Sequence, residues 1–168
     1  MKRLILIGGP MGIGKTSTCR ELQRRLPDNV FLDGDWCWDA VPFRVTAETK
    51  RMVMENITFL LRQFLRCSAY SNILFCWVMH EQSIWGDLLS RLDLKEVQVV
   101  RLTLTCAPDV LENRLRRDID RGVRTPDVID RSLERLARYA QLDIPLLDTT
   151  ALTPEETADE ILKMLPNA

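Results

Sequence analysis

The chain has 168 residues, of which 46% are apolar and 28% charged, a composition typical of globular proteins. Its 23 basic and 24 acidic residues nearly cancel, so no overall field would recruit nucleic acid or an anionic membrane. A membrane-spanning helix needs about 20 apolar residues, whereas the longest apolar run, Ile73 to Met79, has seven.

The first residues and the cysteines both favour a cytoplasmic protein. Met1-Lys2-Arg3 precedes only four apolar residues before two glycines, fewer than the roughly 7–15 of a secretory signal. The five cysteines are odd in number, widely spaced and without a Cys-x-x-Cys pair, and His80 is the single histidine. We therefore expect reduced thiols and no zinc site.

Hydrophobic periodicity predicts strands and helices that alternate along the chain. In the first half we expect strands at Arg3–Ile7, Val30–Asp33 and Asn72–Met79 and helices at Lys15–Leu26 and Thr46–Ala69. The third of these strands is apolar nearly throughout, as a central strand buried on both faces would be.

The second half is richer in helix and closes with a clear helix-start signal. The expected elements are a helix at Ile84–Leu92, a strand at Val97–Leu104, helices at Pro108–Ile119 and Asp127–Ala140, a strand at Pro145–Leu147 and a last helix opened by the capping box Thr153-Pro154-Glu155-Glu156. Strands separated by helices predict an α/β fold with a five-stranded parallel sheet and helices on both faces. Without a linker to split it, the chain is predicted to form one domain, residues 1–168.

A phosphate-binding motif follows the first predicted strand. Residues Gly9-Pro10-Met11-Gly12-Ile13-Gly14-Lys15-Thr16 match G-x-x-x-x-G-K-[ST] without interruption. Such a loop curls so that its N–H groups point at phosphate oxygens, and the next helix adds its partial positive charge. Lys15 is expected to reach the β- and γ-phosphates, and the Thr16 hydroxyl to ligate Mg²⁺. The candidate nucleotide-binding residues here are Gly9, Gly12, Ile13, Gly14, Lys15, Thr16 and Ser17.

Other motifs narrow the class of phosphate-loop protein. The Asn-Lys-x-Asp and Asp-x-x-Gly motifs of GTPases and the Leu-Ser-Gly-Gly signature of transporter ATPases are missing from the sequence. AAA⁺ modules are longer than this chain. A small-molecule kinase is the class that remains.

Asp33-Gly34-Asp35 follows the second predicted strand, at the edge where α/β folds assemble their sites. Here the chain resembles the small P-loop kinases, the group of shikimate kinase, gluconate kinase, adenylylsulfate kinase and the antibiotic phosphotransferases. The resemblance implies a P-loop NTPase three-layer sandwich, with Asp33 holding Mg²⁺ through water and Asp35 orienting or deprotonating an acceptor hydroxyl. The alternative is a plain Asp-Gly turn with solvated carboxylates.

The arginine-rich region after the fourth strand resembles the helical lid of nucleotide and shikimate kinases, here at about residues 115–130. Arg121 and Arg124 flank the break at Gly122, and the resemblance implies that they neutralise charge on the γ-phosphoryl group. Many of the surrounding arginines also have acidic partners at helical spacing, which is typical of a solvated helix surface.

The same resemblance implies an adenine site. Arg114 would stack on the base, and the backbone around Thr149, in Asp148-Thr149-Thr150, would line it. The alternative for this last segment is a loop that leads into the C-terminal helix.

The end of the third strand lacks the Walker B aspartate found in many P-loop proteins. Either Glu81 replaces it, or Thr16 and Asp33 are the only metal ligands of the chain. His80 is a candidate acid or base, although a lone histidine is more often a structural hydrogen-bonding group. Trp77 and Trp85 are interpreted as packing residues.

Acceptor specificity is expected in the irregular segment after Asp35 and on the long helix. Trp36 and Trp38 could form an apolar wall for a ring-bearing acceptor, and Arg44 could contact an anionic group. Packing within the segment is the alternative for the two tryptophans.

The sequence thus predicts a kinase that uses ATP and Mg²⁺ to phosphorylate a hydroxyl group of a small metabolite, nucleoside or antibiotic. It is expected to act as a monomer or homodimer, without nucleic-acid or membrane partners. One alternative is a nucleoside monophosphate kinase, for which Arg44, Arg51, Arg62 and Arg66 are candidate phosphate contacts. The other is a regulatory protein that binds ATP without transferring phosphate.

Overall fold

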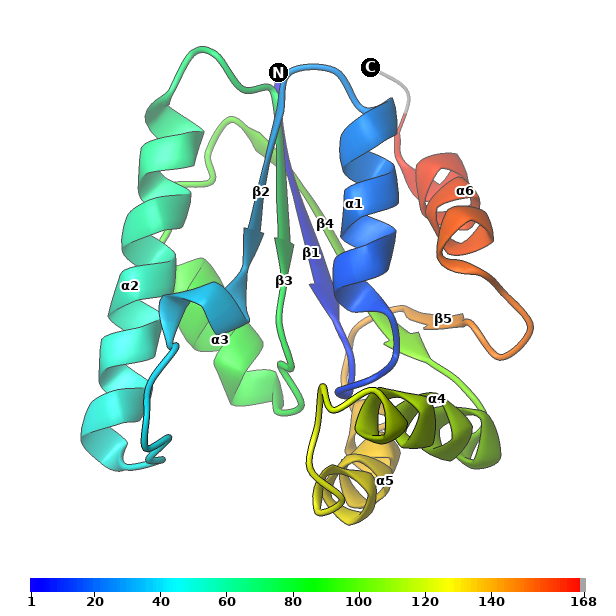
Figure 1. Ribbon diagram of the computed structural model, residues 1–168. Helices are drawn as coiled ribbons and strands as arrows, with labels where there is room; N and C mark the ends of the chain where they lie inside the picture. The colour runs from blue at the N-terminus through cyan, green and yellow to red at the C-terminus, as the bar shows by residue number, and fades with distance from the viewer. Residues whose placement is uncertain (167–168) are drawn as a thin grey trace.

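The computed structural model of the protein describes residues 1–166; the last two residues of the expected domain, 167 and 168, lie outside the described part. Strands and helices alternate as the periodicity predicts (Figure 1). In chain order they are β1 (Lys2–Gly8), α1 (Lys15–Arg25), β2 (Asn29–Asp33), a 3₁₀ turn η1 (Gly34–Cys37), α2 (Ala47–Arg66), β3 (Asn72–Cys76), α3 (Gln82–Ser90), β4 (Val97–Thr105), α4 (Pro108–Asp120), α5 (Val128–Tyr139), β5 (Leu146–Asp148) and α6 (Pro154–Met164).

The five strands form one parallel sheet in the order β2-β3-β1-β4-β5. This arrangement confirms the predicted α/β class and sheet. In the register of the sheet, Cys76 of β3 pairs with Ile7 of β1 on one side and with Asp33 of β2 on the other. The carboxyl ends of these three strands therefore meet at one edge, which is the lower edge in Figure 1.

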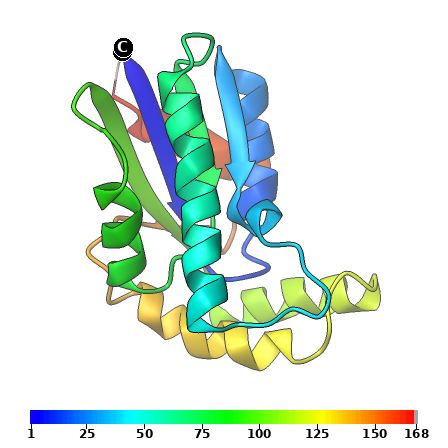
Figure 2. The same ribbon diagram turned by 90° about the vertical axis from the view of Figure 1, so that its left-hand side faces the viewer.

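Helices cover both faces of the sheet and divide the core into two clusters. Alternate residues of β1 point to opposite faces, with Ile5 and Ile7 in one cluster and Leu4 and Leu6 in the other. The first cluster includes buried residues of α1, α4 and α6, and the second includes residues of α2 and α3. Figures 1 and 2 show α4 and α5 below the sheet, across its carboxyl edge.

Most element ends agree with the sequence prediction to within one or two residues, and two of them differ more. The strand expected through Met79 ends at Cys76, which pairs with Asp33, the last residue of β2. The helix expected through Ala69 ends at Arg66, where the Lys2 ammonium group donates to the Cys67 carbonyl oxygen at 2.5 Å.

The helix start that the sequence signalled at Thr153 is present, and a second capped start, not signalled, occurs at Thr46. Thr46 precedes α2 and Thr153 precedes α6, and each forms a capping box with the residue three positions later. Within residues 1–166, no helix combines the length and the apolar character needed to cross a membrane.

A test of this core is Leu74→Ala. Leu74 is fully buried in the central part of β3, so truncation should lower the free energy of unfolding by about 2–5 kcal/mol in urea denaturation. Leu146→Ala, in the edge strand β5 with a 43% exposed side chain, is the matched control and should change it much less. Similar losses in both variants would contradict the assigned core.

Candidate nucleotide and acceptor site

The phosphate-loop residues 9–14 connect β1 to α1 at the carboxyl edge of the sheet. Gly12 and Gly14 have φ angles of 77° and 105°, in the left-handed region that only glycine adopts readily. Gly12 also packs against α4, where a Cβ atom would lie 2.5 Å from Leu115 Cδ2. The loop conformation thus depends on glycine and is fixed against the lid helices.

Lys15 opens α1, and its ammonium group is turned back over the loop. It donates to the carbonyl oxygens of Gly9 at 2.9 Å and Pro10 at 2.8 Å. Burial lowers the pKa of Lys15, while the nearby carboxylates of Asp33 and Asp35 oppose this shift. The ammonium group therefore lies among the groups that the sequence singled out.

Thr16 and Asp33 meet as the predicted metal-ligand pair. The Thr16 hydroxyl donates to Asp33 Oδ2 at 2.6 Å, and the Asp33 side chain is buried. No cluster of three or more His, Cys, Asp or Glu that could hold a metal ion occurs among residues 1–166. Two oxygen ligands nevertheless suit Mg²⁺, which keeps several waters and shares its shell with substrate phosphates.

Asp35 lies on η1, beside the same carboxylate. Asp33 Oδ1 accepts from the Asp35 backbone N–H at 3.1 Å. The residue as a whole is exposed, although its carboxyl group is partly desolvated. This desolvation raises the pKa of Asp35, the Asp33 carboxylate raises it further, and Lys15 and Arg124 oppose the shift.

Arg114 of α4 and Thr149 are brought together beside the phosphate loop. The guanidinium donates to the carbonyl oxygens of Ile13 at 3.2 Å and Thr149 at 2.8 Å. Thr149 is itself held to the end of β4, because its N–H donates to the Thr105 carbonyl oxygen at 2.8 Å. The guanidinium edges are thus occupied by backbone carbonyls, and the structure joins the two predicted adenine-site residues to the loop.

The two lid arginines have different surroundings. Arg124 is half-buried, pairs with Asp118 at 3.1 Å, and its charge acts on both Lys15 and Asp35. Arg121, the residue after α4, is exposed and makes no side-chain hydrogen bond within the described part of the chain. The fold therefore brings Arg124, and not Arg121, to the carboxylates.

Sequence reasoning missed a contact between α5 and the segment after β3. The Tyr139 hydroxyl donates to the Val78 carbonyl oxygen, and Arg138 lies 3.8 Å from Glu81. Glu81 is exposed and also lies 3.5 Å from His80. Burial lowers the pKa of His80, and Arg135 lowers it further. These contacts favour a structural role for His80 and Glu81 at the base of the lid.

The aromatic residues after Asp35 lie on the side of the site away from α4. Trp36 is 51% exposed and stands edge-on to Phe31, with the Arg20 guanidinium 5.2 Å from its ring centroid. Trp38 packs on Phe43, with ring centroids 4.5 Å apart. The one feature of the sequence that points to the Arg20 contact is that Arg20 lies one helical turn after Thr16.

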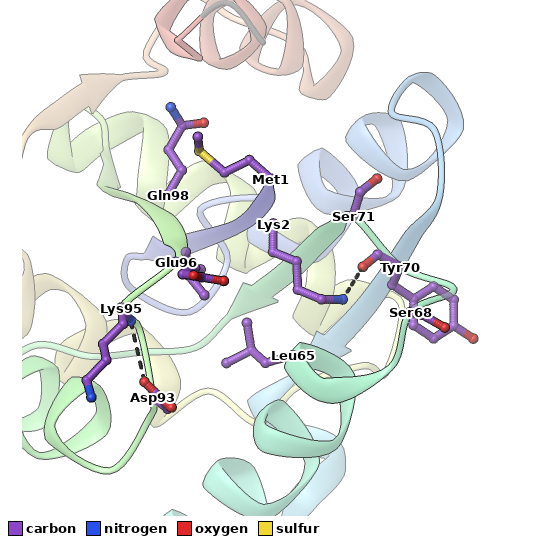
Figure 3. Close-up of a pocket in the computed structure, with 11 residues that line it drawn as sticks. Met1, Lys2, Leu65, Ser68, Tyr70, Ser71, Asp93, Lys95, Glu96 and Gln98 are labelled. Carbon is purple, nitrogen blue, oxygen red and sulfur yellow. Dashed lines mark hydrogen bonds between the residues drawn. The ribbon is translucent and has the colours of Figure 1, made fainter.

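Of two surface depressions, one lies away from this site and the other borders it. One of about 1110 Å³ lies at the opposite, amino edge of the sheet, between the starts of β1 and β4 (Figure 3). Lys2 points across it, but its ammonium group donates to the carbonyl oxygens of Cys67 and Tyr70 at 2.5 and 2.6 Å. This cation thus already serves to join α2 to the sheet. The other, about 540 Å³, includes the predicted nucleotide-binding residue Ser17 together with Arg20, Arg24 and Thr153.

The parallel sheet, the loop and the α4–α5 pair define the fold of the P-loop kinases. A family model described as an AAA domain matches residues 5–136, and the chain belongs to that family. The length argument against AAA⁺ modules was therefore wrong for the family described by this model, which fits within 168 residues.

Individual relatives include several kinases. Guanylate kinase of Thermobifida fusca (strain YX) is 28% identical over an alignment of 188 positions, gaps included, which covers 98% of this chain and 91% of that protein. The solved tunicamycin resistance protein of Deinococcus radiodurans has a TM-score of 0.71 at 23% identity, covering 100% and 98% of the two chains. Shikimate kinase from Acinetobacter baumannii has a TM-score of 0.64 at 19% identity, covering 98% and 92%. The structural likenesses confirm the expected fold.

Arg114 can be tested against Arg116, its neighbour on the same helix. Arg114→Ala removes the bonds to Ile13 and Thr149, and we expect the dissociation constant for ATP to rise about tenfold, the scale of one lost hydrogen bond to a charged group. Among the described residues Arg116 pairs only with Glu112, on the exposed surface, and Arg116→Ala should bind ATP like the parent in titration calorimetry. Equal affinity in both variants would remove Arg114 from the nucleotide site.

Asp35→Asn tests the electrostatic strain at the carboxylates. A folded-state pKa above the ordinary value of 3.8 means that ionised Asp35 destabilises the fold at neutral pH, and that this penalty disappears as pH falls towards 3.8. The neutral variant should therefore have a higher urea midpoint than the parent at pH 7, and the difference should shrink by pH 4.5. Asp39→Asn, at an exposed residue of the same segment, controls for the loss of one negative charge. A midpoint unchanged at pH 7 would contradict this account.

Proposed function

We propose that the protein is a kinase that uses ATP and Mg²⁺ to phosphorylate a hydroxyl group of a small molecule. The observation that carries the proposal is the hydrogen bond between Thr16 of the phosphate loop and Asp33, with Asp35 two residues on. Nucleotide binding alone requires only the loop and Lys15. The second carboxylate, that of Asp35, lies next to the proposed metal ligands Thr16 and Asp33 and would serve to orient a nucleophile.

Each residue of the site would have a separate role in the reaction. Lys15 and the loop N–H groups would hold the phosphates, and Thr16 with Asp33 would hold Mg²⁺, which supplies charge stabilisation to the transferring group. Asp35 would accept the proton of the acceptor hydroxyl as its oxygen attacks the γ-phosphorus and the bond to the bridging oxygen of ADP breaks. Arg124 would offset the charge that develops on the phosphoryl oxygens.

A nucleoside monophosphate kinase is the second candidate, favoured by the similarity to guanylate kinase of Thermobifida fusca. Its acceptor is a phosphate, which would need cations on the acceptor side. Of the four arginines considered for this role, Arg62 donates to the Arg91 carbonyl oxygen and Arg66 ends α2 at the far edge of the sheet (Figure 1). Arg44, just before α2, and Arg51, near its start, remain as candidate phosphate contacts.

Exposed apolar side chains near the start of α2 favour the hydroxyl kinase. They include Trp36, Val41, Phe43, Val45 and Met52. Apolar surface of this kind suits an acceptor with an uncharged ring or chain better than a phosphate. The solved tunicamycin resistance protein of Deinococcus radiodurans supports the inclusion of nucleoside antibiotics among the acceptors tested.

The test is transfer of labelled phosphate from γ-labelled ATP to pooled nucleosides, nucleoside monophosphates, sugars, polyol acids and antibiotics. A hydroxyl product should be lost with Lys15→Ala, and Asp35→Ala should slow its formation by roughly 10²–10⁴-fold, the range for a positioned proton acceptor. Asp39→Ala is the matched control and should retain activity.

Two other outcomes would change the assignment. A labelled diphosphate product that survives Asp35→Ala but is lost with Arg44→Ala or Arg51→Ala would identify a monophosphate kinase. ATP binding abolished by Lys15→Ala, with no labelled product from any pool, would favour a regulatory protein that does not transfer phosphate.

A further inference from the structure

The outer face of α2 exposes apolar side chains that the rest of the fold does not cover. Ile57 and Leu61 of this helix are buried in the core cluster beside the sheet. On the opposite side of the helix, Phe59 is 58% exposed and Met52 is 40% exposed. Figure 2 faces α2 along its length, and no other helix or strand of the described chain lies across it.

The residues of this outer face recur at the spacing of two packed helices. Alternating steps of four and three residues connect Glu48, Met52, Glu55, Phe59, Arg62 and Arg66. Such a pattern keeps one side of a helix turned towards a partner helix. On one flank Asn56 donates to the Cys37 carbonyl oxygen at 3.1 Å, and on the other Arg62 donates to the Arg91 carbonyl oxygen at 2.9 Å. The stripe between these flanks therefore faces outward.

Charge is divided between the two ends of this stripe. Glu48 and Glu55 precede Phe59, and Arg66 follows it at the last residue of α2. All three charged residues are exposed, and within residues 1–166 their side chains make no ion pair or hydrogen bond. A helix face that is acidic at one end and basic at the other complements a second copy of itself running in the opposite direction.

A two-fold axis at the level of Ile57 would bring the complementary ends together. It sets Glu48 opposite Arg66 of the second copy, and the same contact repeats on the other side of the axis. Phe59 is close to the axis in sequence, so the two phenyl rings, one from each copy, would meet at the centre. An apolar centre with a charged rim is typical of interfaces between proteins.

We propose that the protein forms a homodimer in which the α2 helices of two copies pack antiparallel, with Phe59 at the centre and Glu48 paired with Arg66 of the second copy. The proposal does not depend on the proposed function, because neither the phosphate loop nor the Asp33–Asp35 segment takes part. Of the exposed apolar residues considered for the acceptor, only Met52 belongs to this stripe.

The first test is sedimentation velocity of the full chain. Concentrations from roughly 1 to 300 μM suit a single helix pair, because small interfaces associate weakly. The parent should shift from monomer to dimer, and Phe59→Ala should stay monomeric, since central aromatic residues contribute most to binding. Because Phe59 is exposed, its urea midpoint should hardly change. A parent that is monomeric throughout, or a Phe59→Ala variant that associates like the parent, would overturn the proposal.

Charge reversal tests the pairing of Glu48 with Arg66. Glu48→Arg and Arg66→Glu should each raise the dissociation constant of the dimer about tenfold or more, because two attractions become two repulsions. Lys163→Glu, on α6 at the other face of the sheet, is the matched control and should associate like the parent. Unchanged association in both reversed variants would overturn the proposal.

Mixing the two reversed variants separates pairing from a folding defect. A dimer of one Glu48→Arg copy and one Arg66→Glu copy has opposite charges at both contacts, so an equimolar mixture should associate like the parent. The two positions lie about 27 Å apart along one helix, so they cannot compensate for each other within one chain. A mixture that associates as weakly as its components would overturn the proposal.

Discussion

The alignment of three strand ends is the constraint on which the candidate site depends. Because Cys76 pairs with Ile7 on one side and Asp33 on the other, the phosphate loop and the η1 turn leave the sheet at the same level. Thr16 and Asp33 can then meet at 2.6 Å without long connecting segments. A slip of β2 by one residue would turn the Asp33 side chain to the opposite face of the sheet and separate the pair.

The charged groups at this edge of the sheet affect one another's ionisation. Burial opposes the charged form of Lys15, and desolvation together with the Asp33 charge opposes the charged form of Asp35. Asp35 favours the charged form of Lys15, and Lys15 favours the charged form of Asp35. Arg124 favours the ionised carboxylate of Asp35 and disfavours the ammonium form of Lys15. Such mutual dependence is common where a fold keeps charge away from water for chemistry, and it makes the site sensitive to any movement of η1.

The sequence predicted those features that depend on neighbours along the chain. The strand–loop–helix around Lys15 and the capping box at Thr153 are local patterns, and both are present. Features that depend on distant neighbours were not predicted: the apolar run suggested a strand through Met79, but the strand stops where β2 stops. The contact between Trp77 and Gly34 likewise joins two segments that only the sheet brings together. Arg121 and Arg124 could not be ranked either, since the turn at Gly122 decides which of them reaches the site.

The division of the core into two clusters by the sheet bears on how proteins of this kind can change. The phosphate loop, Arg114 and Thr149 belong to the half built on α1, α4 and α6, whereas Trp38 and the Phe43 ring stacked on it rest on the half built on α2. Substitutions that reshape one half are separated from the other by the width of the sheet, so their effects on stability should be nearly additive. Because the two halves are independent, the residues that would bind one substrate can change while those that would bind the other stay the same. For the proposed kinase, residues 38–59 would then be the segment to randomise when new acceptors are sought in the laboratory.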